Sequence, residues 1–361
     1  MSKPSLSVIC ATYNGAEKLP GLFICLSANL LLNPELAEII FVIDGSNDTS
    51  EEMIRDFTSN HSSTRVITKK CEINLGISQA RNVGIAEAQS ELIAFVDDDC
   101  RPSPSWINDV ISLWGSASME IVGIGGIVSS HNPVTFNQRY CGAVTPLRPY
   151  PLRADRRTIA SRLKNYYTKA PDTYENAEYL VGCCMTFRKY SLEYVHGFDP
   201  SMKFGGDDAY ICKKLRRAYG DHVLVIDPRL VMPHDFSLKF RDSFRRSYSY
   251  GKASGRQSRE IRKPPSLNPG PFITCFLLSA GLATTQMFAP RISIVLSAFI
   301  LFFVEIFIYN FLLVGRQIIV TKSISEKFFF GLAFFFCEIV NTYGFVIGFF
   351  KKDKALAYKR A

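Results

Sequence analysis

Short apolar runs alternate with helical patterns along the first hundred residues of the chain. The runs are typical of strands and lie at 6–11, 38–43, 65–68 and 92–96. The helical patterns lie between them, one running through Leu32 and the others at 50–57 and 77–88. The run from Glu38 to Ile43 is nearly continuous, as in parallel strands buried on both faces. This order predicts an α/β fold with a doubly wound, mostly parallel sheet.

Polar residues stand where three of the predicted strands end. Tyr13, Asp44 and Asp97 each lie at the end of an apolar run. In doubly wound sheets, ligands bind in the crevice outside the carboxyl ends of the strands. We therefore expect these three side chains to face one binding crevice.

The pattern is less regular after residue 99. Strands are expected at 121–128, 179–187 and 223–226, and a basic amphipathic helix at 209–219. Residues 131–176 are rich in Pro, Arg and Tyr and show no clear period. We expect determinants of specificity in that stretch.

The composition changes at Pro271, after which Phe, Ile, Leu, Val and Ala dominate. Three apolar segments follow, at 272–289, 292–314 and 328–350. Each is long enough to cross, or nearly cross, a hydrocarbon core of about 30 Å. The third contains Glu338 and Asn341, which are costly at a bilayer centre.

Basic residues flank the apolar segments, at 256–263, at Arg316 and Lys322, and at 351–360. The positive-inside rule places all three flanks in the cytoplasm. Two crossings satisfy this rule, whereas a third would place the basic C-terminus outside. We therefore expect two spans and a third segment that is interfacial or re-entrant.

The formal net charge of the chain is +9. A basic balance suits phosphorylated ligands, anionic lipid or nucleic acid. The basic run at 229–263 abuts the apolar region and favours a membrane surface. None of the usual nucleic-acid-binding signatures occurs in the sequence. We expect membrane lipids, and no nucleic acid, among the partners.

Ten cysteines occur without a CxxC pair or zinc-ligand spacing, and the polar N-terminus leads straight into a strand. These features predict reduced thiols and no export signal. We expect a multi-pass protein of the plasma (inner) membrane whose domain 1–255 faces the cytoplasm. A basic juxtamembrane linker at 256–270 and a membrane region at 271–361 would follow it.

Asp97, Asp98 and Asp99 emerge together at the end of a predicted strand. Adjacent carboxylates repel one another unless a cation neutralises them. Oxygen ligands suit Mg²⁺ or Mn²⁺, which often bind through one or two carboxylates together with substrate phosphates. An acidic turn that caps the next helix explains the same residues, so both interpretations stay open.

A second acidic pair, Asp207 and Asp208, follows Gly205 and Gly206 and begins a predicted helix. Acidic residues are favourable at helix N-termini, so capping is the simplest interpretation. The glycines would also let another molecule approach the backbone closely. A carboxylate there could deprotonate an acceptor hydroxyl.

Seven short motifs follow one another in a specific order, at 8–14, 42–48, 74–84, 95–99, 182–188, 197–199 and 207–208. Together they resemble glycosyltransferase family 2, the inverting transferases with the GT-A fold, over roughly residues 5–255. Each motif alone is weak, whereas the ordered set is specific. The resemblance implies a nucleotide-binding half at about 1–100 and an acceptor-binding half at about 101–255.

The resemblance also implies roles for single residues. A nucleotide-sugar donor would be bound by Thr12, Tyr13, Asn14, Asp44, Arg81, Asp97 and Asp98. A divalent cation, Mg²⁺ or Mn²⁺, would be held by Asp97, Asp99 and His234, with Asp99 the firmest ligand. His234 is equally explained as a turn residue. Asp208 would be the general base, and Asp207 is the second candidate for that role.

Some positions depart from the family pattern. Ile43 precedes Asp44 where a second acid is common, so the alignment there is uncertain by one position. Cys184 stands where many relatives have Asn, and Asp207 where Glu is usual. The Gln-x-x-Arg-Trp signature of processive relatives is absent, which favours transfer of one or a few sugars.

The implied function is inverting, non-processive transfer of a sugar to a hydroxyl of a saccharide or lipid-linked acceptor, in cell-envelope polysaccharide or glycolipid synthesis. One alternative is a polyprenyl-phosphate sugar synthase. Another is a membrane-bound protein that binds nucleotide sugars without catalysis. The basic run 244–252 would grip a diphosphate or lie on anionic headgroups, and the sequence favours neither.

Overall fold

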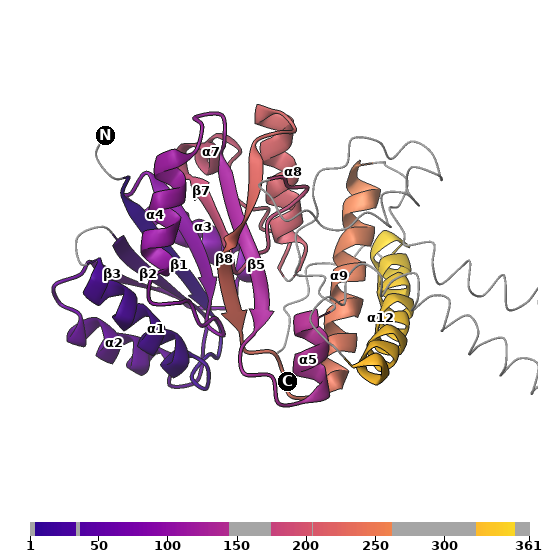
Figure 1. Ribbon diagram of the computed structural model, residues 1–361. Helices are drawn as coiled ribbons and strands as arrows, with labels where there is room; N and C mark the ends of the chain where they lie inside the picture. Colours follow the sequence, from indigo (N-terminus) through magenta and orange to yellow (C-terminus); the bar gives the residue numbers. More distant parts are fainter. Residues whose placement is uncertain (1–3, 34–36, 144–174, 204, 262–322, 351–361) are drawn as a thin grey trace, which may run out of the picture.

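The computed structural model describes residues 4–33, 37–143, 175–203, 205–261 and 323–350 (Figure 1). The strands are β1 (Leu6–Thr12), β2 (Ala37–Asp44), β3 (Val66–Cys71), β4 (Leu92–Asp97), β5 (Gly123–Ser130), β6 (Glu175–Asn176), β7 (Met185–Arg188) and β8 (Leu224–His234). The helices are α1 (Leu19–Leu32), α2 (Ser50–Asn60), α3 (Ile77–Glu87), α4 (Trp106–Ser116), α5 (Phe136–Ala143), α7 (Lys189–Tyr194), α8 (Asp207–Tyr219), α9 (Phe240–Ile261) and α12 (Ile324–Phe350).

One 8-stranded sheet runs through the described residues in the order β3-β2-β1-β4-β7-β5-β8-β6. Strands β1 to β4 pair in parallel. Strand β7 is antiparallel to its neighbours β4 and β5, whereas β5 and β8 are parallel. The mostly parallel α/β fold is confirmed, and the carboxyl ends of β1, β2 and β4 meet at one edge of the sheet.

Side chains of the central strands alternate between two cores, one on each face of the sheet. In β1, Val8 belongs to the core that includes α1 and α4, whereas Ile9 belongs to the core that includes α3 and α8. The same alternation separates Phe41 from Ile40 in β2. Because side chains along a strand have a period of two, an uninterrupted apolar run supplies both cores.

The elements predicted for the first hundred residues are confirmed to within a few residues at their ends. The strand predicted at 179–187 is wrong over most of its length, because β7 begins only at Met185. Residues 181–184 instead form a turn, in which the Cys184 amide donates to the Val181 carbonyl at 2.9 Å. Both turn and strand are buried, so apolar content alone did not distinguish them.

Helices α4, α5 and α9 lie where the sequence pattern predicts no element. Helix α9 is 22 residues long. The predicted boundary between residues 255 and 256 falls inside it, so residues 256–261 continue a helix instead of beginning a linker. The reason is the packing of α9 on α12, which extends to both sides of that position.

Helix α12 packs along α9 through glycines on both helices (Figure 1). A Cβ atom added to Gly251 of α9 would overlap the carbonyl oxygen of Asn341. One added to Gly344 of α12 would overlap the carbonyl oxygen of Tyr248. Small residues allow two helix backbones to approach this closely. The Asn341 side chain donates to the Ser247 carbonyl at 3.2 Å, so this polar group is satisfied within the helix pair.

Among the described residues, one helix is long and apolar enough to cross a membrane, Phe329–Phe350 of α12, and 39% of its most apolar stretch is buried. A core helix meets the same criterion, so this finding is weak evidence of a span. Phe330, near the start of α12, packs against the rings of Phe136 and Tyr140 on α5. The two predicted spans, 272–289 and 292–314, and the basic tail lie outside the described residues.

Candidate active site

A cleft that is partly open to solvent lies at the carboxyl ends of β1, β2 and β4. Ten of the eleven predicted site residues line it, namely Thr12, Tyr13, Asp44, Arg81, Asp97, Asp98, Asp99, Asp207, Asp208 and His234. The starts of α3 and α8 and the end of β8 contribute to the same cleft. The crevice expected from the strand ends is therefore present.

Asn14 is the predicted site residue that does not line the cleft. Its backbone is left-handed, with φ of 52°, and its side-chain oxygen accepts a hydrogen bond from the Asn47 amide at 2.9 Å. The Asn14 amide donates to the Ser46 hydroxyl at 3.0 Å. Asn14 therefore holds the loop after β1 against the loop after β2.

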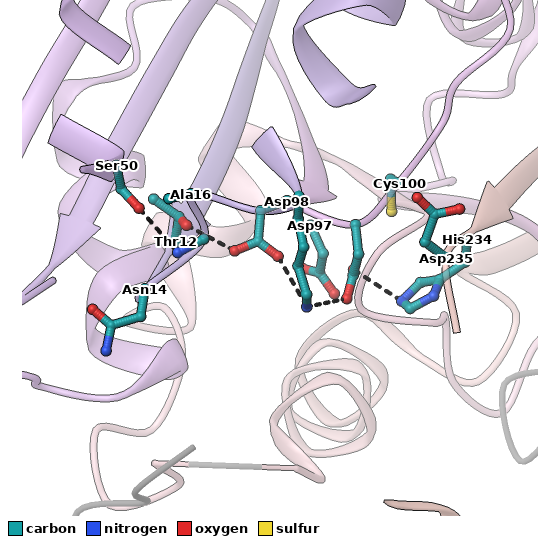
Figure 2. A network of polar contacts seen from close by, with 12 residues as sticks. Thr12, Asn14, Ala16, Ser50, Asp97, Asp98, Cys100, His234 and Asp235 are labelled. Carbon is teal, nitrogen blue, oxygen red and sulfur yellow. Dashed lines mark hydrogen bonds and ion pairs between the residues drawn. The ribbon is translucent and has the colours of Figure 1, made fainter. Parts of the chain in front are cut away.

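The acidic cluster at the end of β4 is neutralised by other side chains of the chain. The Lys18 ammonium lies 2.6 Å from Asp99 and 3.5 Å from Asp98. Thr12 donates its hydroxyl to Asp98 at 2.7 Å. The Nε2 of His234 lies 3.0 Å from Asp99, which completes the network from Thr12 to His234 (Figure 2).

These contacts favour a ligand site over a helix cap. Helix α4 begins only at Trp106, and its N-cap residue is Ser105, so the cluster does not cap it. Burial disfavours the charged form of Asp99, yet its pKa lies well below the usual range because His234 and Lys18 stabilise the carboxylate. Asp99 is thus a charged group in the wall of the cleft.

Arg81 joins the two acidic groups of the cleft. Its guanidinium donates to Asp97 at 3.1 Å and also to Asp207. It lies 5.6 Å from the ring centres of both Phe95 and Phe198, and its side chain is only 5% exposed. Burial raises the pKa of Asp97, and Arg81 opposes that shift. Arg81 therefore connects the end of β4 to the start of α8. The N–H groups of its guanidinium donate to the carboxylates of Asp97 and Asp207.

Asp207 and Asp208 open α8 but have different surroundings. Asp207 is paired with Arg81, whereas no cation among the described residues forms an ion pair with Asp208. Asp208 accepts hydrogen bonds from the amides of Gly182 at 3.2 Å and Ala209 at 2.7 Å. Burial and the charge of Asp207 raise the pKa of Asp208 to about 7. A carboxyl with this pKa is suited to general-base chemistry at neutral pH.

The glycine pair before α8 makes the sharp entry into that helix. Gly205 and Gly206 have φ of 73° and 80°, in the left-handed region that favours glycine. The ring of Tyr250 on α9 lies against Gly205, 2.9 Å from where a Cβ atom would be. The pair therefore serves the turn and the close approach of α9.

Asp44 holds the loop that follows β3. Its two carboxylate oxygens accept hydrogen bonds from the amides of Leu75 at 2.7 Å and Gly76 at 2.9 Å. Burial raises its pKa, and these hydrogen bonds oppose the shift. Ile43 is fully buried in the core, so Asp44 is the residue of this strand end that faces the cleft.

Three groups that could hold a metal ion converge in the cleft. The ligand atoms of Asp97, Cys183 and His234 all lie within 4.8 Å of one another. His234 is 6% exposed, and its Nδ1 has no hydrogen-bond partner among the described residues. A buried, unpartnered imidazole nitrogen fits a metal ligand. Asp99, expected to be the firmest ligand, stands outside this group of three and is engaged with Lys18 and His234.

Several polar lining residues are additional to the predicted set, namely Asn74, Cys183, Lys203, Arg246 and Tyr250. Asn74 and Cys183 lie inside motifs that resemble the family, and Arg246 and Tyr250 lie in the basic run 244–252. The sequence therefore indicated that these segments could contact a ligand, although it did not single out these residues. Nothing in the sequence marks Lys203 or Lys18. All nine cysteines in the described part of the chain are free, as expected of reduced thiols.

The family model described as Glycosyl transferase family 2 matches residues 7–195. Among curated proteins, the chain is similar to glycosyltransferase AglE of Haloferax volcanii, with 28% identity over 139 residues, which cover 38% of this chain and 44% of that protein. It is also similar to a pre-mycofactocin glycosyltransferase of Mycobacterium tuberculosis, with 25% identity over 251 residues, 67% of this chain and 47% of that protein. The chain thus matches less than half the length of these relatives.

Among solved structures, the chain is similar to the mannosyltransferase PcManGT of Pyrobaculum calidifontis in complex with GDP-Man and Mn²⁺. The TM-score is 0.60 at 15% sequence identity, and the match covers 98% of this chain and 89% of that one. At this identity the likeness concerns the fold, which is the fold described above.

Proposed function

The chain belongs to glycosyl transferase family 2, whose model matches more than half of its residues, and from this premise we propose that it is an inverting glycosyltransferase. Its donor is a nucleotide sugar. Its acceptor is a hydroxyl group of a saccharide or of a lipid-linked saccharide. It transfers one or a few sugars and does not polymerise.

One observation carries this proposal: a group of residues that can hold a cation and a carboxyl with a pKa near neutrality line the same cleft. Asp97 and His234 belong to that group, and Asp208 is the carboxyl. Arg81 connects them through its ion pairs with Asp97 and Asp207. An inverting transfer needs both a stabilised leaving group and a base.

The chain's own residues would activate the acceptor. Asp208 accepts the proton of the acceptor hydroxyl. At the same time the oxygen of that hydroxyl forms a bond to the anomeric carbon of the donor sugar, and the bond from that carbon to the nucleoside diphosphate breaks. Burial and the charge of Asp207 keep the pKa of Asp208 near 7, where proton transfer is efficient. Arg81 holds Asp207 in place.

The donor would be held by the loops at the strand ends. Thr12, Tyr13 and Asp44 orient the nucleotide, which turns binding into orientation of the anomeric carbon. Asp97, Asp99 and His234 hold a divalent cation, Mn²⁺ or Mg²⁺. Such a cation, when bound, stabilises as a Lewis acid the charge that develops on the leaving diphosphate.

The proposed place of action is the cytoplasmic face of the plasma membrane, in synthesis of a cell-envelope polysaccharide or glycolipid. Aromatic side chains seven residues apart on α12 support membrane contact, namely Phe329, Phe336, Tyr343 and Phe350, which are 41–77% exposed. Trp and Tyr, together with apolar side chains, are typical of membrane interfaces. The expectation of several spans depends on residues 272–314.

The test begins by identifying the donor. UDP-, GDP- and dTDP-sugars are screened with Mn²⁺ for a rise in melting temperature, because a true donor stabilises the folded chain. With that donor, Asp208→Asn is expected to lower kcat by about 10²- to 10⁴-fold while donor binding survives. Asp221→Asn, at an exposed carboxylate outside the cleft, serves as the matched control.

Other outcomes would identify the alternatives. Appreciable turnover of Asp208→Asn would favour a phosphate acceptor, as in a polyprenyl-phosphate sugar synthase, because a phosphate needs no strong base. Donor binding without release of nucleoside diphosphate would favour a non-catalytic binding protein. Asp99→Ala is expected to lose metal-stimulated donor binding, and unchanged binding would count against Asp99 as a ligand.

A further inference from the structure

The turn at 181–184 carries a thiol into the acidic cleft. Cys183 lines the cleft and is 3% exposed. Its sulfur lies within 4.8 Å of a carboxylate oxygen of Asp97 and a ring nitrogen of His234. Strands β4, β7, β5 and β8 are consecutive neighbours in the sheet, so the end of β4, the turn before β7 and the end of β8 converge through the fold itself.

A second observation indicates that this group of three binds a ligand. The Nδ1 of His234 is buried and has no partner among the described residues. The ring is held in place by stacking on Phe236, with 4.5 Å between ring centres, and by the contact of Nε2 with Asp99. A buried nitrogen that remains unpaired costs free energy unless something occupies it.

We propose that the sulfur of Cys183 is a metal ligand in this cleft, together with Asp97 and His234, and that the centre binds thiophilic divalent ions such as Co²⁺ and Zn²⁺ more tightly than Mg²⁺. The inference rests on the proposed cation site and adds Cys183 to the residues proposed to hold the ion. When the ion binds, the thiol proton is released to solvent and sulfur binds as the thiolate.

The donor set decides which ion is taken. Mg²⁺ requires oxygen ligands in near-ideal octahedral geometry and keeps several waters. Imidazole and thiolate ligands suit Zn²⁺ and related ions. A ligand set that adds an imidazole and a thiolate to carboxylate oxygens therefore disfavours Mg²⁺.

The experiment is a titration of the full-length protein with CoCl₂, without a nucleotide, followed by absorbance. A thiolate-to-cobalt charge-transfer band in the near ultraviolet is expected to grow and saturate with a single ion per chain. Cys183→Ser should lose the band and bind Co²⁺ at least about tenfold more weakly. The Mg²⁺ concentration that displaces half of the Co²⁺ should fall by the same factor.

Cys184→Ser is the matched control, because Cys184 is the adjacent buried cysteine and does not line the cleft. It should keep both the band and the affinity. A wild-type chain saturated with Co²⁺ that shows no such band overturns the role of Cys183, without any variant having to fold.

The proposed function fails in a different way. If Asp97→Ala and His234→Ala bind Co²⁺ as tightly as the wild type, or if no Co²⁺ binds at all, the cation site itself is wrong and this inference falls with it. If Co²⁺ binds and depends on Asp97 and His234 but not on Cys183, the cation site stands and only the donor set proposed here is overturned.

Discussion

The Lys18 ammonium forms ion pairs with Asp98 and Asp99, which belong to the segment that resembles a metal-binding motif. Its backbone is fixed, because Arg101 donates to the Lys18 carbonyl at 3.1 Å. Its side chain is 34% exposed. A divalent ion bound by the same carboxylates must displace this ammonium, so Lys18 lowers the apparent affinity for metal.

Lys18→Met is therefore expected to raise the affinity for Mn²⁺ by about threefold to tenfold, because a partly exposed ion pair is worth roughly 1 kcal/mol. Electron paramagnetic resonance of the free ion measures the affinity without a donor. Lys69→Met, which removes a surface ion pair with Glu87 at 2.9 Å, is the control and should change nothing. Equal affinities of Lys18→Met and wild type would contradict the competition.

Asp208 should determine the pH dependence of the reaction. A base must be deprotonated, and its pKa is about 7 in the chain without ligands. We expect kcat/KM to rise with pH and to level off above an apparent pKa of about 7, since this ratio reports the free enzyme. Initial rates from about pH 5 to about pH 9 measure it. A profile that is flat through neutrality would exclude Asp208 as the base.

Most of the residues that line the cleft could be predicted from the sequence because they lie in short motifs, many of them at the ends of elements. Their partners could not, because partners come from distant parts of the chain. Arg81 illustrates this: its motif marked it as a contact of the nucleotide, but its donors go to Asp97 and Asp207. Only the fold places α8 beside the end of β4.

Helix α9 connects the cleft to α12. One of its faces presents Arg246 and Tyr250 to the cleft. Another presents Gly251 and Gly255 to the backbone of α12. Arg246 also lies 5.4 Å from the ring centre of Phe236, beside His234. The packing of the two helices therefore fixes the position of one wall of the cleft.

Gly251→Ala is expected to destabilise the chain by roughly 1–3 kcal/mol, because the added methyl group overlaps the α12 backbone. Gly115→Ala in α4 is the matched control, since nothing lies within 4 Å of its added methyl group. That control should be neutral or stabilise by up to about 1 kcal/mol, the helix propensity gained. Thermal unfolding of both variants measures the difference, and equal melting temperatures would contradict the packing.

Prediction of the elements succeeded where strand and helix patterns are regular. In β1, β2 and β4, continuous apolar runs coincide with strands that are covered on both faces. Later elements depend on contacts that a periodic pattern does not record. Helix α9 is polar on much of its surface, and its partner α12 begins more than sixty residues later. The turn at 181–184 is as apolar as a strand because it is buried between elements.

The folded molecule keeps in its cleft an acid, Asp208, whose charged form is disfavoured by burial and by the charge of Asp207. The pKa of Asp208 is raised from 3.8 to about 7, so the folded chain binds more protons than the unfolded chain between these values. Stability therefore falls as the pH rises through this window. The fold therefore retains in its cleft a carboxyl group, Asp208, that lowers the stability of the folded chain at neutral pH.

Asp208→Asn should remove this loss of folding stability at neutral pH. We expect the variant to melt at a higher temperature than the wild type at about pH 8, and at nearly the same temperature at about pH 2.5, where Asp208 is protonated in both states. Scanning calorimetry without donor or metal measures the difference. A constant difference across this range would show that Asp208 does not titrate in the folded chain.

The glycine contacts between α9 and α12 also limit how this sequence can vary. A side chain introduced at Gly251 meets the backbone of α12, and one introduced at Gly344 meets the backbone of α9. A smaller side chain on the neighbouring helix would relieve neither clash, because the added atom overlaps main-chain atoms of that helix. A random library over both stretches should therefore yield folded members almost exclusively with the smallest residues at both positions. Two segments about ninety residues apart would thus have to evolve as a single unit.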